Sequence, residues 1–235
     1  MNFHEGEFIY INKPYQMSSF GALAFVRTRL SKALHVKRLK TGHAGTLDPL
    51  ATGVLILCTG KATKRIESLQ LASKEYTATL QLGATTPSYD REHTVNMTYP
   101  TRHITRELIE SVLPQFVGDI QQVPPIYSAV MVDGHRAYTL ARQGNEAELK
   151  AKTIHIDEIE LTDFNPETMQ MSIRVGCGKG TYIRSLARDI GEALGSGAFL
   201  TALCRTRLGD VRIEDCLTLD DFPAWLEDQM ALKAD

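Results

Sequence analysis

The sequence predicts an α+β fold, in which a mixed and largely antiparallel sheet is flanked by helices and loops. Three observations carry this prediction. Alternating or short continuous apolar runs indicate strands, and capped segments with apolar residues three and four apart indicate helices. These segments follow one another without the regular strand–helix alternation that is typical of a parallel sheet.

Strands are expected wherever apolar side chains alternate or form a short run. Segment 74–82 alternates regularly, so its apolar residues would share one buried face. Segment 54–58 is continuously apolar, which suits a fully buried strand. The predicted strands are 8–11, 54–58, 74–82, 153–161 and 169–175, and 128–132 with the turn at 133–134 suggests a hairpin.

Helices are expected where a capping residue precedes an amphipathic segment. Ser18 or Ser19 would cap a helix over 19–34. The residues expected on one apolar face of this helix are Phe20, Leu23, Ala24 and Leu30. Further helices are predicted at 105–116, in a segment that ends at Gly144, and at 181–194 before Gly195.

Composition excludes several classes of protein. Hydrophobic residues make up 43% of the 235 and charged residues 23%, a balance that is typical of a folded domain and not of a disordered chain. The longest purely apolar run, 54–58, is far shorter than the about 20 residues that a membrane helix needs. The 4 cysteines form no Cys-x-x-Cys pair, so neither a zinc ribbon nor a disulfide framework is expected. No secretory signal is visible at the N-terminus, and we expect a cytoplasmic protein.

Charge is distributed unevenly along the chain, although the net charge is only −2. Between Lys13 and Arg65 the sole acid is Asp48, whereas the segment from Asp210 onward is strongly acidic. Basic faces attract phosphate backbones, but a solvated helix face explains the same charges. The candidate phosphate contacts are Arg27, Lys37, Arg38, Lys40, Lys61, Lys64 and Arg65.

Two glycine-bearing segments fail as nucleotide-binding motifs. Gly60-Lys61 is followed by Ala62 where a phosphate-binding loop needs Ser or Thr, and Leu55 stands where its first glycine belongs. The glycines from Gly176 to Gly180 lie between a strand and a helix, but the third is one position early for a dinucleotide fingerprint.

A third glycine-rich segment, GHAGTLDPLATG at 42–53, is the most informative part of the sequence. Its glycines suit tight backbone bends or close approach. Pro49 biases Asp48 away from helical backbone, so its carboxylate is expected on an extended loop. An Asp before a Pro is also a common turn residue, and this pattern by itself leaves a structural and a catalytic role open.

Segment 42–55, GHAGTLDPLATGVL, resembles the signature loop of the TruB family of tRNA pseudouridine synthases. Further segments resemble the same family in order along the chain, from about residue 8 to 222. These segments are Lys13-Pro14 with Ser18-Ser19, Lys74-Glu75-Tyr76, residues 123–129 (VPPIYSA), residues 141–144 (ARQG), residues 179–185 (KGTYIRS), and Leu203 through Gly209.

The resemblance implies the pseudouridine synthase fold around a central RNA-binding cleft, and it implies the reaction. Uridine would be isomerised by breaking its N1–C1′ bond, turning the uracil and rejoining it through C5. This chemistry requires neither a cofactor nor a metal. The family's essential carboxylate corresponds to Asp48, which would attack C1′ or stabilise positive charge there, as the second carboxylate does in glycosidases.

The resemblance also assigns roles to residues around Asp48. Arg184 would pair with its carboxylate, and Asp90 would join both in one charge network. Tyr76 would stack on the uracil, while Tyr182 and Leu203 would line its pocket; core packing is the alternative for all three. His43 would fill the space that the flipped base or its neighbours vacate.

The resemblance implies that the substrate is the T-loop of tRNA, at the uridine of position 55. The protein would bind it as a monomer, without a guide RNA, a membrane or an obligate protein partner. The resemblance implies one catalytic domain over 1–235 with an acidic C-terminal helix or tail and no PUA domain, because few residues follow Gly209. The sequence departs from the family at Asn12, Gln16, Pro87, Ser88, Gly178 and Cys204.

Two other functions are the alternatives to a pseudouridine synthase. One is an RNA chaperone role, alone or beside catalysis, and the other is a nucleotide-binding oxidoreductase.

Overall fold

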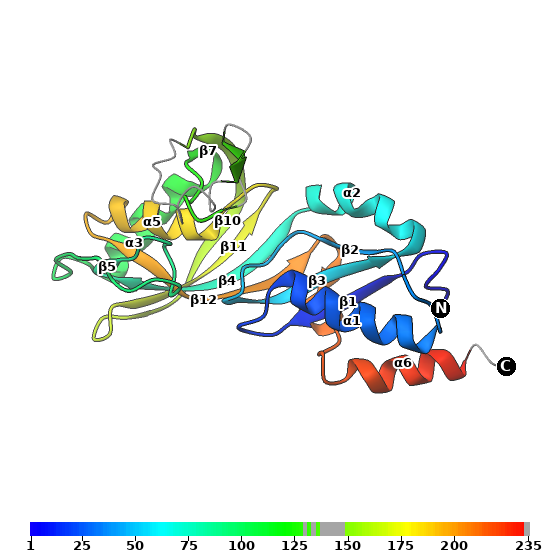
Figure 1. Ribbon diagram of the computed structural model, residues 1–235. Coiled ribbons are helices and arrows are strands. Elements are labelled where there is room, and N and C mark those ends of the chain that lie inside the picture. The colour runs from blue at the N-terminus through cyan, green and yellow to red at the C-terminus, as the bar shows by residue number, and fades with distance from the viewer. Residues whose placement is uncertain (129–130, 133–134, 137–148, 233–235) are drawn as a thin grey trace. The chain divides into compact units, whose positions relative to one another are not determined.

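The computed structural model divides into two compact units of chain (Figure 1). The first comprises Met1–Tyr76 with Cys204–Asp235, and the second comprises Thr77–Leu203. Strands β4 (Lys74–Leu82) and β12 (Ala198–Leu208) contribute residues to both. The structure describes all residues except 129–130, 133–134, 137–148 and 233–235.

In the first unit, helices cover both faces of a sheet with the strand order β1-β3-β12. Strand β2 pairs with β3 and β13 with β12, and the pairings of β1 and β2 with β3 are antiparallel. Its further elements are β1 (Phe8–Lys13), α1 (Ser19–Ala33), β2 (Thr41–Ala44), β3 (Ala51–Thr59), η1 (Gly60–Arg65), α2 (Ile66–Leu71), β13 (Val211–Arg212), η3 (Ile213–Asp215) and α6 (Phe222–Ala231).

Strand β3 is buried on both faces, as its continuous apolar run predicts. Leu55 and Leu57 pack with residues of β1, α1 and α6. Ile56 and Cys58 point to the opposite face and pack with Leu208 and residues of η1 and α2. The strand therefore lies between two hydrophobic clusters, and this rigid position fixes the segment that precedes it.

Helix α1 begins as predicted, but of its four predicted apolar-face residues only Leu23 and Leu30 are buried. Ser18 is the N-cap and its side chain accepts a hydrogen bond from the Gly21 amide at 2.9 Å. The predicted burial of Phe20 is wrong, because its side chain is 62% exposed. The inward Ser19 fixes the rotation of the helix, so the next residue faces outward. The buried residues are Ser19, Ala22, Leu23, Val26 and Leu30.

The second unit contains a sheet with the order β12-β4-β11-β10-β7, in which β10 pairs antiparallel with both β11 and β7. Helix α5 buries most of one side, including Leu186 and Ile190. Its further elements are β5 (Ala84–Thr85), β6 (Met97–Thr98), α3 (Arg106–Val112), η2 (Leu113–Phe116), β7 (Gly118–Gln122), β8 (Met131–Val132), β9 (His135–Arg136), β10 (Lys152–Asn165), β11 (Gln170–Cys177) and α5 (Ile183–Ala193).

Two predicted helices have different bounds in the structure. The segment 105–116 is α-helical only to Val112 and continues as the 3₁₀ helix η2, because Pro114 has no amide hydrogen to donate. Helix α5 begins at Ile183, since Tyr182 still has extended backbone. The hairpin of β8 and β9 is present. The predicted helix that ends at Gly144 and the ARQG motif lie outside the described residues.

The predicted α+β class with a largely antiparallel sheet is confirmed. The RNA-binding cleft stays a prediction. Within the part of the chain that the structure describes, no helix has both the length and the apolar character needed to cross a bilayer.

Candidate active site

Asp48 lies on a short loop between β2 and β3, where the sequence predicts extended backbone. The informative segment is not a loop throughout, because 41–44 form β2 and β3 begins at Ala51. Two glycines of this segment have left-handed backbone, with φ +76° at Gly45 at the start of the loop and +103° at Gly53 within β3. A Cβ at Gly53 would lie 2.2 Å from the backbone oxygen of Arg205, so only glycine fits between the two chains.

Ser19, the first residue of α1, holds this loop from one side. Its hydroxyl accepts a hydrogen bond from the Leu47 amide at 2.8 Å and donates one to the Leu47 carbonyl at 3.0 Å. The Ala51 amide donates to the Asp48 carbonyl at 3.0 Å. The backbone on both sides of Asp48 is therefore fixed, which directs its half-buried side chain.

Lys13, the last residue of β1, is completely buried beside the same loop. Its ammonium group donates to the carbonyls of Pro14 at 3.0 Å, Met17 at 2.5 Å and Pro49 at 3.4 Å. Burial lowers the pKa of Lys13 to about 8, and the nearby Asp48 carboxylate opposes that shift. Lys13 is thus protonated at neutral pH, and its charge interacts with that of Asp48.

Arg205 on β12 is the second buried cation at the loop, with 1% of its surface exposed. Its Nε donates to the Val54 carbonyl at 2.9 Å and its Nη2 donates to the Gly45 carbonyl at 3.1 Å. The guanidinium therefore joins the start of the Asp48 loop to the strand that follows it. The charge of Arg205 also lowers the pKa of Lys13 and of His43.

Two further predicted residues lie in the first unit. His43 is half-buried on β2, opposite Leu57 of β3, and its Nδ1 makes no hydrogen bond with any described residue. Burial is the main cause that lowers the pKa of His43, so its imidazole is neutral near pH 7. Tyr76 on β4 is 7% exposed, as expected for a residue on the apolar face of this strand. Its stacking on uracil stays a prediction.

Arg184 and Asp90 form a buried ion pair in the second unit. Arg184 lies in the first turn of α5, and its Nε is 3.8 Å from the Asp90 Oδ2. Its other nitrogens donate to the carbonyls of Ser88 at 3.3 Å and Tyr127 at 2.9 Å. The Ser88 hydroxyl donates to the Asp90 Oδ1 at 2.5 Å. The pairing of this arginine with Asp48 stays a prediction.

Tyr182 and Leu203 are both half-buried in the second unit. Tyr182 is the residue before α5, and Gln122 of β7 holds its backbone with two hydrogen bonds. The Tyr182 amide donates to the Gln122 Oε1 at 2.9 Å, and the Gln122 Nε2 donates to the Tyr182 carbonyl at 3.2 Å. Leu203 lies on β12. Their place in a uracil pocket stays a prediction.

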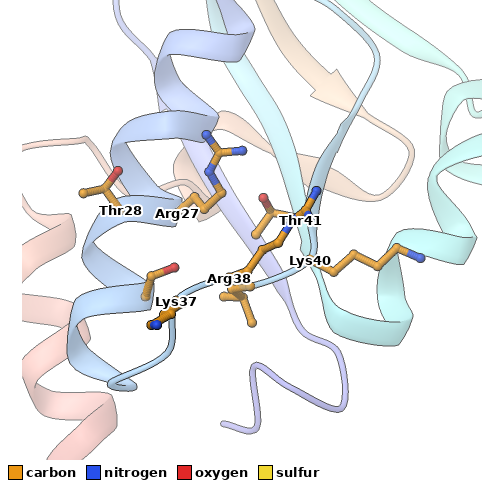
Figure 2. Close-up of a pocket in the computed structure, with 8 residues that line it drawn as sticks. Arg27, Thr28, Lys37, Arg38, Lys40 and Thr41 are labelled. Carbon is orange, nitrogen blue, oxygen red and sulfur yellow. The ribbon is translucent and has the colours of Figure 1, made fainter.

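Four of the predicted phosphate contacts line one pocket in the first unit, with a volume of about 920 Å³ (Figure 2). The pocket lies between the second half of α1 and the segment leading into β2. The residues that line it are Arg27, Thr28, Ser31, Lys37, Arg38, Leu39, Lys40 and Thr41. The prediction that these cations act together is therefore compatible with their positions.

The other three predicted phosphate contacts lie on η1. Lys64 is exposed, and the Arg65 guanidinium lies 5.2 Å from the ring centroid of Phe8. Lys61 forms an exposed ion pair with Glu5, with 2.5 Å between Nζ and Oε2. Glu5 precedes the basic stretch in the sequence, so a count of charges within that stretch misses this neutralising partner.

The sequence offers Ser19 only as a possible helix cap and marks neither Arg205 nor Gln122, although Ser19 and Arg205 fix the Asp48 loop and Gln122 fixes the backbone of Tyr182. The pair Ser18-Ser19 is a signal for a helix cap, and by sequence either serine fits that role. Arg205 and the half-buried Arg207 have the same position in the strand alternation, so no pattern identifies the buried one. Among the described residues, no three His, Cys, Asp or Glu side chains are grouped to hold a metal.

Comparisons with known proteins agree over nearly the whole chain. Residues 31–183 match the family model described as TruB family pseudouridylate synthase (N terminal domain), and residues 184–234 match the tRNA pseudouridylate synthase B C-terminal domain. The tRNA pseudouridine synthase B proteins of Phocaeicola vulgatus and Bacteroides fragilis are each 62% identical over 230 residues, which is 97% of this chain and 97% of each relative.

A solved structure with the same fold is a chain of the archaeal box H/ACA sRNP Nop10-Cbf5 complex. It matches with a TM-score of 0.67 and 28% identity, over 97% of this chain and 57% of the matched chain. The resemblance seen in the glycine-rich segment around Asp48 is confirmed by these matches. The chain belongs to the TruB family of pseudouridylate synthases.

Proposed function

We propose that this protein isomerises the uridine at position 55 in the T-loop of tRNA to pseudouridine, with Asp48 as the catalytic carboxylate. The observation that carries the proposal is the position of Asp48, on a loop held by Ser19, Lys13 and Arg205. The relatives from Phocaeicola vulgatus and Bacteroides fragilis, named as tRNA pseudouridine synthases, support tRNA as the substrate.

The reaction needs one group that acts at C1′ of the ribose. The N1–C1′ bond breaks, the uracil turns, and a new bond forms between C1′ and C5. The proton leaves C5, and N1 gains a proton. A carboxylate serves this sequence by bonding to C1′ or by stabilising the positive charge that develops there, which are the two roles of the second carboxylate in glycosidases.

The buried cations prepare Asp48 for this role. Lys13 and Arg205 donate to the backbone of the loop and place positive charge around it. The carboxylate that acts on an electron-poor carbon would thus lie in the field of two positive charges. Because these contacts exist before RNA binds, little reorganisation is needed at the moment of reaction.

The target base has to leave its stack, since C1′ and C5 are both inaccessible within it. We propose that Tyr76 stacks on the flipped uracil, that Tyr182 and Leu203 line its pocket, and that His43 fills the vacated space. The neutral state of His43 suits this last role, because a neutral imidazole stacks among bases without a desolvated charge. Arg184 with its partner Asp90 would then orient the Asp48 carboxylate.

We propose that shape and backbone contacts select the folded T-arm, as is usual for structured RNA. The pocket of Arg27, Lys37, Arg38 and Lys40 and the cations of η1 supply the charge. The protein would act on tRNA without a guide RNA, unlike the box H/ACA assembly that shares its fold.

To test the proposal, the protein is incubated with an unmodified tRNA transcript that carries tritium at uridine C5 and with no other RNA, and the released tritium is measured. Release of tritium from one position, mapped to uridine 55, is expected. Asp48→Asn should retain tRNA binding and abolish release, because the amide is nearly the same size and has no charge. A matched control is Asp163→Asn, an exposed carboxylate on β10.

Two outcomes would contradict the proposal. Tritium release by the Asp48→Asn protein would show that another group acts at C1′. Binding of tRNA without release by the unaltered protein would favour an RNA chaperone that keeps the fold without the reaction.

A further inference from the structure

The outward face of α1 carries an aromatic side chain that the core does not use. Phe20 is 62% exposed although its neighbour Ser19 is buried. Residues seven and eleven positions further along a helix return to the same face, which places Phe20, Arg27 and Ser31 in one row. This row lies beside the buried face of α1, with Phe20 exposed and with Arg27 and Ser31 half-buried.

Arg27 connects this aromatic ring to the basic pocket. Its guanidinium carbon lies 5.7 Å from the Phe20 ring centroid, and the same residue lines the pocket. Figure 2 shows Arg27 and Thr28 on the helix, with Lys37, Arg38 and Lys40 on the adjoining segment. An exposed ring and a group of cations therefore lie next to each other on one surface of the first unit.

The chemistry of the pocket points to phosphate. Four of its eight lining residues are cationic, three carry hydroxyl groups and none is acidic. Lys37, Arg38 and Lys40 are exposed, so their charges are available to a ligand. Hydroxyl and guanidinium donors bind phosphate oxygens in nucleic-acid complexes. An acidic peptide offers charge without a flat ring system, whereas a nucleotide offers both phosphate and a base that stacks on phenylalanine.

We propose that the outward face of α1 binds an unpaired nucleotide of the RNA substrate, with its base stacked on Phe20 and the adjoining phosphates in the basic pocket. The inference rests on the proposed function, because the RNA is the tRNA substrate itself. Phe20 follows Ser19, which bonds to Leu47 next to Asp48, so the stacked nucleotide lies close to the uridine on which Asp48 would act. Bases within a stem cannot stack in this way, and the nucleotide therefore belongs to the loop.

The first test concerns the ring. Phe20→Leu keeps an apolar side chain but removes the aromatic face, and it should raise both the Kd and the KM for an isolated T-arm about ten-fold. Phe20→Tyr restores a stacking face and should return both constants to the unaltered values. Leu71→Ala, at another exposed apolar residue of the first unit, is the matched control and should change neither. Melting curves verify that each variant is folded.

The second test separates stacking from charge by the salt dependence of binding. Lys37→Ala and Arg38→Ala should each flatten the slope of log K against log salt by roughly 0.7 to 0.9 for a lost phosphate contact. Phe20→Leu should weaken binding and leave the slope unchanged, because stacking releases no counterions. Lys32→Ala is the control, since this exposed cation of α1 does not line the pocket.

The two proposals fail in different ways. If the unaltered protein releases no tritium from tRNA, the proposed function is wrong. If release is normal and Phe20→Leu binds the T-arm as tightly as Leu71→Ala does, the stacking site is wrong and the enzyme proposal is unaffected. An unchanged salt slope in both pocket variants would likewise overturn the phosphate part of the inference.

Discussion

At the scale of single residues, the loop that carries Asp48 owes its shape to side chains far away in the sequence. Asp48 and the glycines around it are visible in the sequence, because glycines and a following proline restrict the backbone. Lys13 and Arg205 lie in segments that resemble the family, but no local pattern shows that they are buried or that they bond to this loop, since charged residues are mostly exposed. The sequence thus predicts where the carboxylate is but not what holds it.

A residue-scale prediction concerns Arg184. Its three nitrogens serve three different partners, Asp90, Ser88 and Tyr127. Arg184→Lys keeps the charge but replaces the planar fork by one point charge, which cannot reach all three. We expect kcat for tritium release to fall at least about a hundred-fold. Arg174→Lys on β11 is the matched control, because its partners Glu158 and Glu160 are exposed.

A rate for Arg184→Lys near that of the unaltered enzyme would show that charge alone suffices at this position. Loss of tRNA binding with an unchanged kcat at saturating RNA would instead assign Arg184 to substrate contact. Melting curves of the two lysine variants distinguish either result from a general loss of stability.

At the scale of elements, α1 shows why a correct helix does not ensure a correct face. The cap at Ser18 and the extent of the helix follow from local signals. The rotation of the helix depends on the buried bond between Ser19 and Leu47, a tertiary contact that outweighs the exposure of one phenylalanine. The strand β4 has its predicted bounds, because the alternation of apolar residues in its sequence matches the alternation of buried residues in the structure.

An element-scale prediction follows from the two serines. Ser19→Ala removes both hydrogen bonds to Leu47 and leaves buried polar groups without a partner, which costs about 1–3 kcal/mol of stability. We expect a lower kcat and an unchanged KM, since the loop shifts while the RNA surface does not. Ser18→Ala also destabilises the helix, by about 1 kcal/mol through loss of the cap, but should leave kcat unchanged.

Measured melting temperatures and kcat values decide between the two serines. If both variants lose stability and neither loses kcat, the bond to Leu47 contributes to folding alone. If Ser18→Ala also lowers kcat, the end of the helix as a whole positions the loop.

At the scale of the whole molecule, charge is separated along the sequence and across the elements. The acidic C-terminal segment contains β13, η3 and α6, and α6 packs through Phe222 and Leu226 into the cluster that α1 also joins. Its acids at 220, 221, 227 and 228 are exposed, and because their negative charges repel phosphate, this part of the surface does not bind a phosphate backbone. That the chain is one catalytic domain without a PUA domain stays a prediction.

A prediction at the scale of the whole molecule tests whether the basic pocket and η1 alone bind the phosphates. If the pocket and the cations of η1 make the phosphate contacts, an isolated T-arm presents nearly all the phosphates that the protein uses. Each contact contributes roughly −0.7 to −0.9 to the slope of log K against log salt. Binding titrations should therefore give similar slopes for full tRNA and for the T-arm. A much steeper slope for full tRNA would require a second RNA surface outside the residues proposed here.

The bonds from Arg205 to Gly45 and Val54 also set an order of events during synthesis. The loop that carries Asp48 leaves the ribosome long before Arg205, and at 5–20 residues per second the interval is roughly eight to thirty seconds. Until residue 205 is made, the carbonyls of Gly45 and Val54 lack that partner. A nascent chain therefore carries every residue of the signature loop before Arg205 can bond to the backbone of that loop, and these bonds form only once β12 is made.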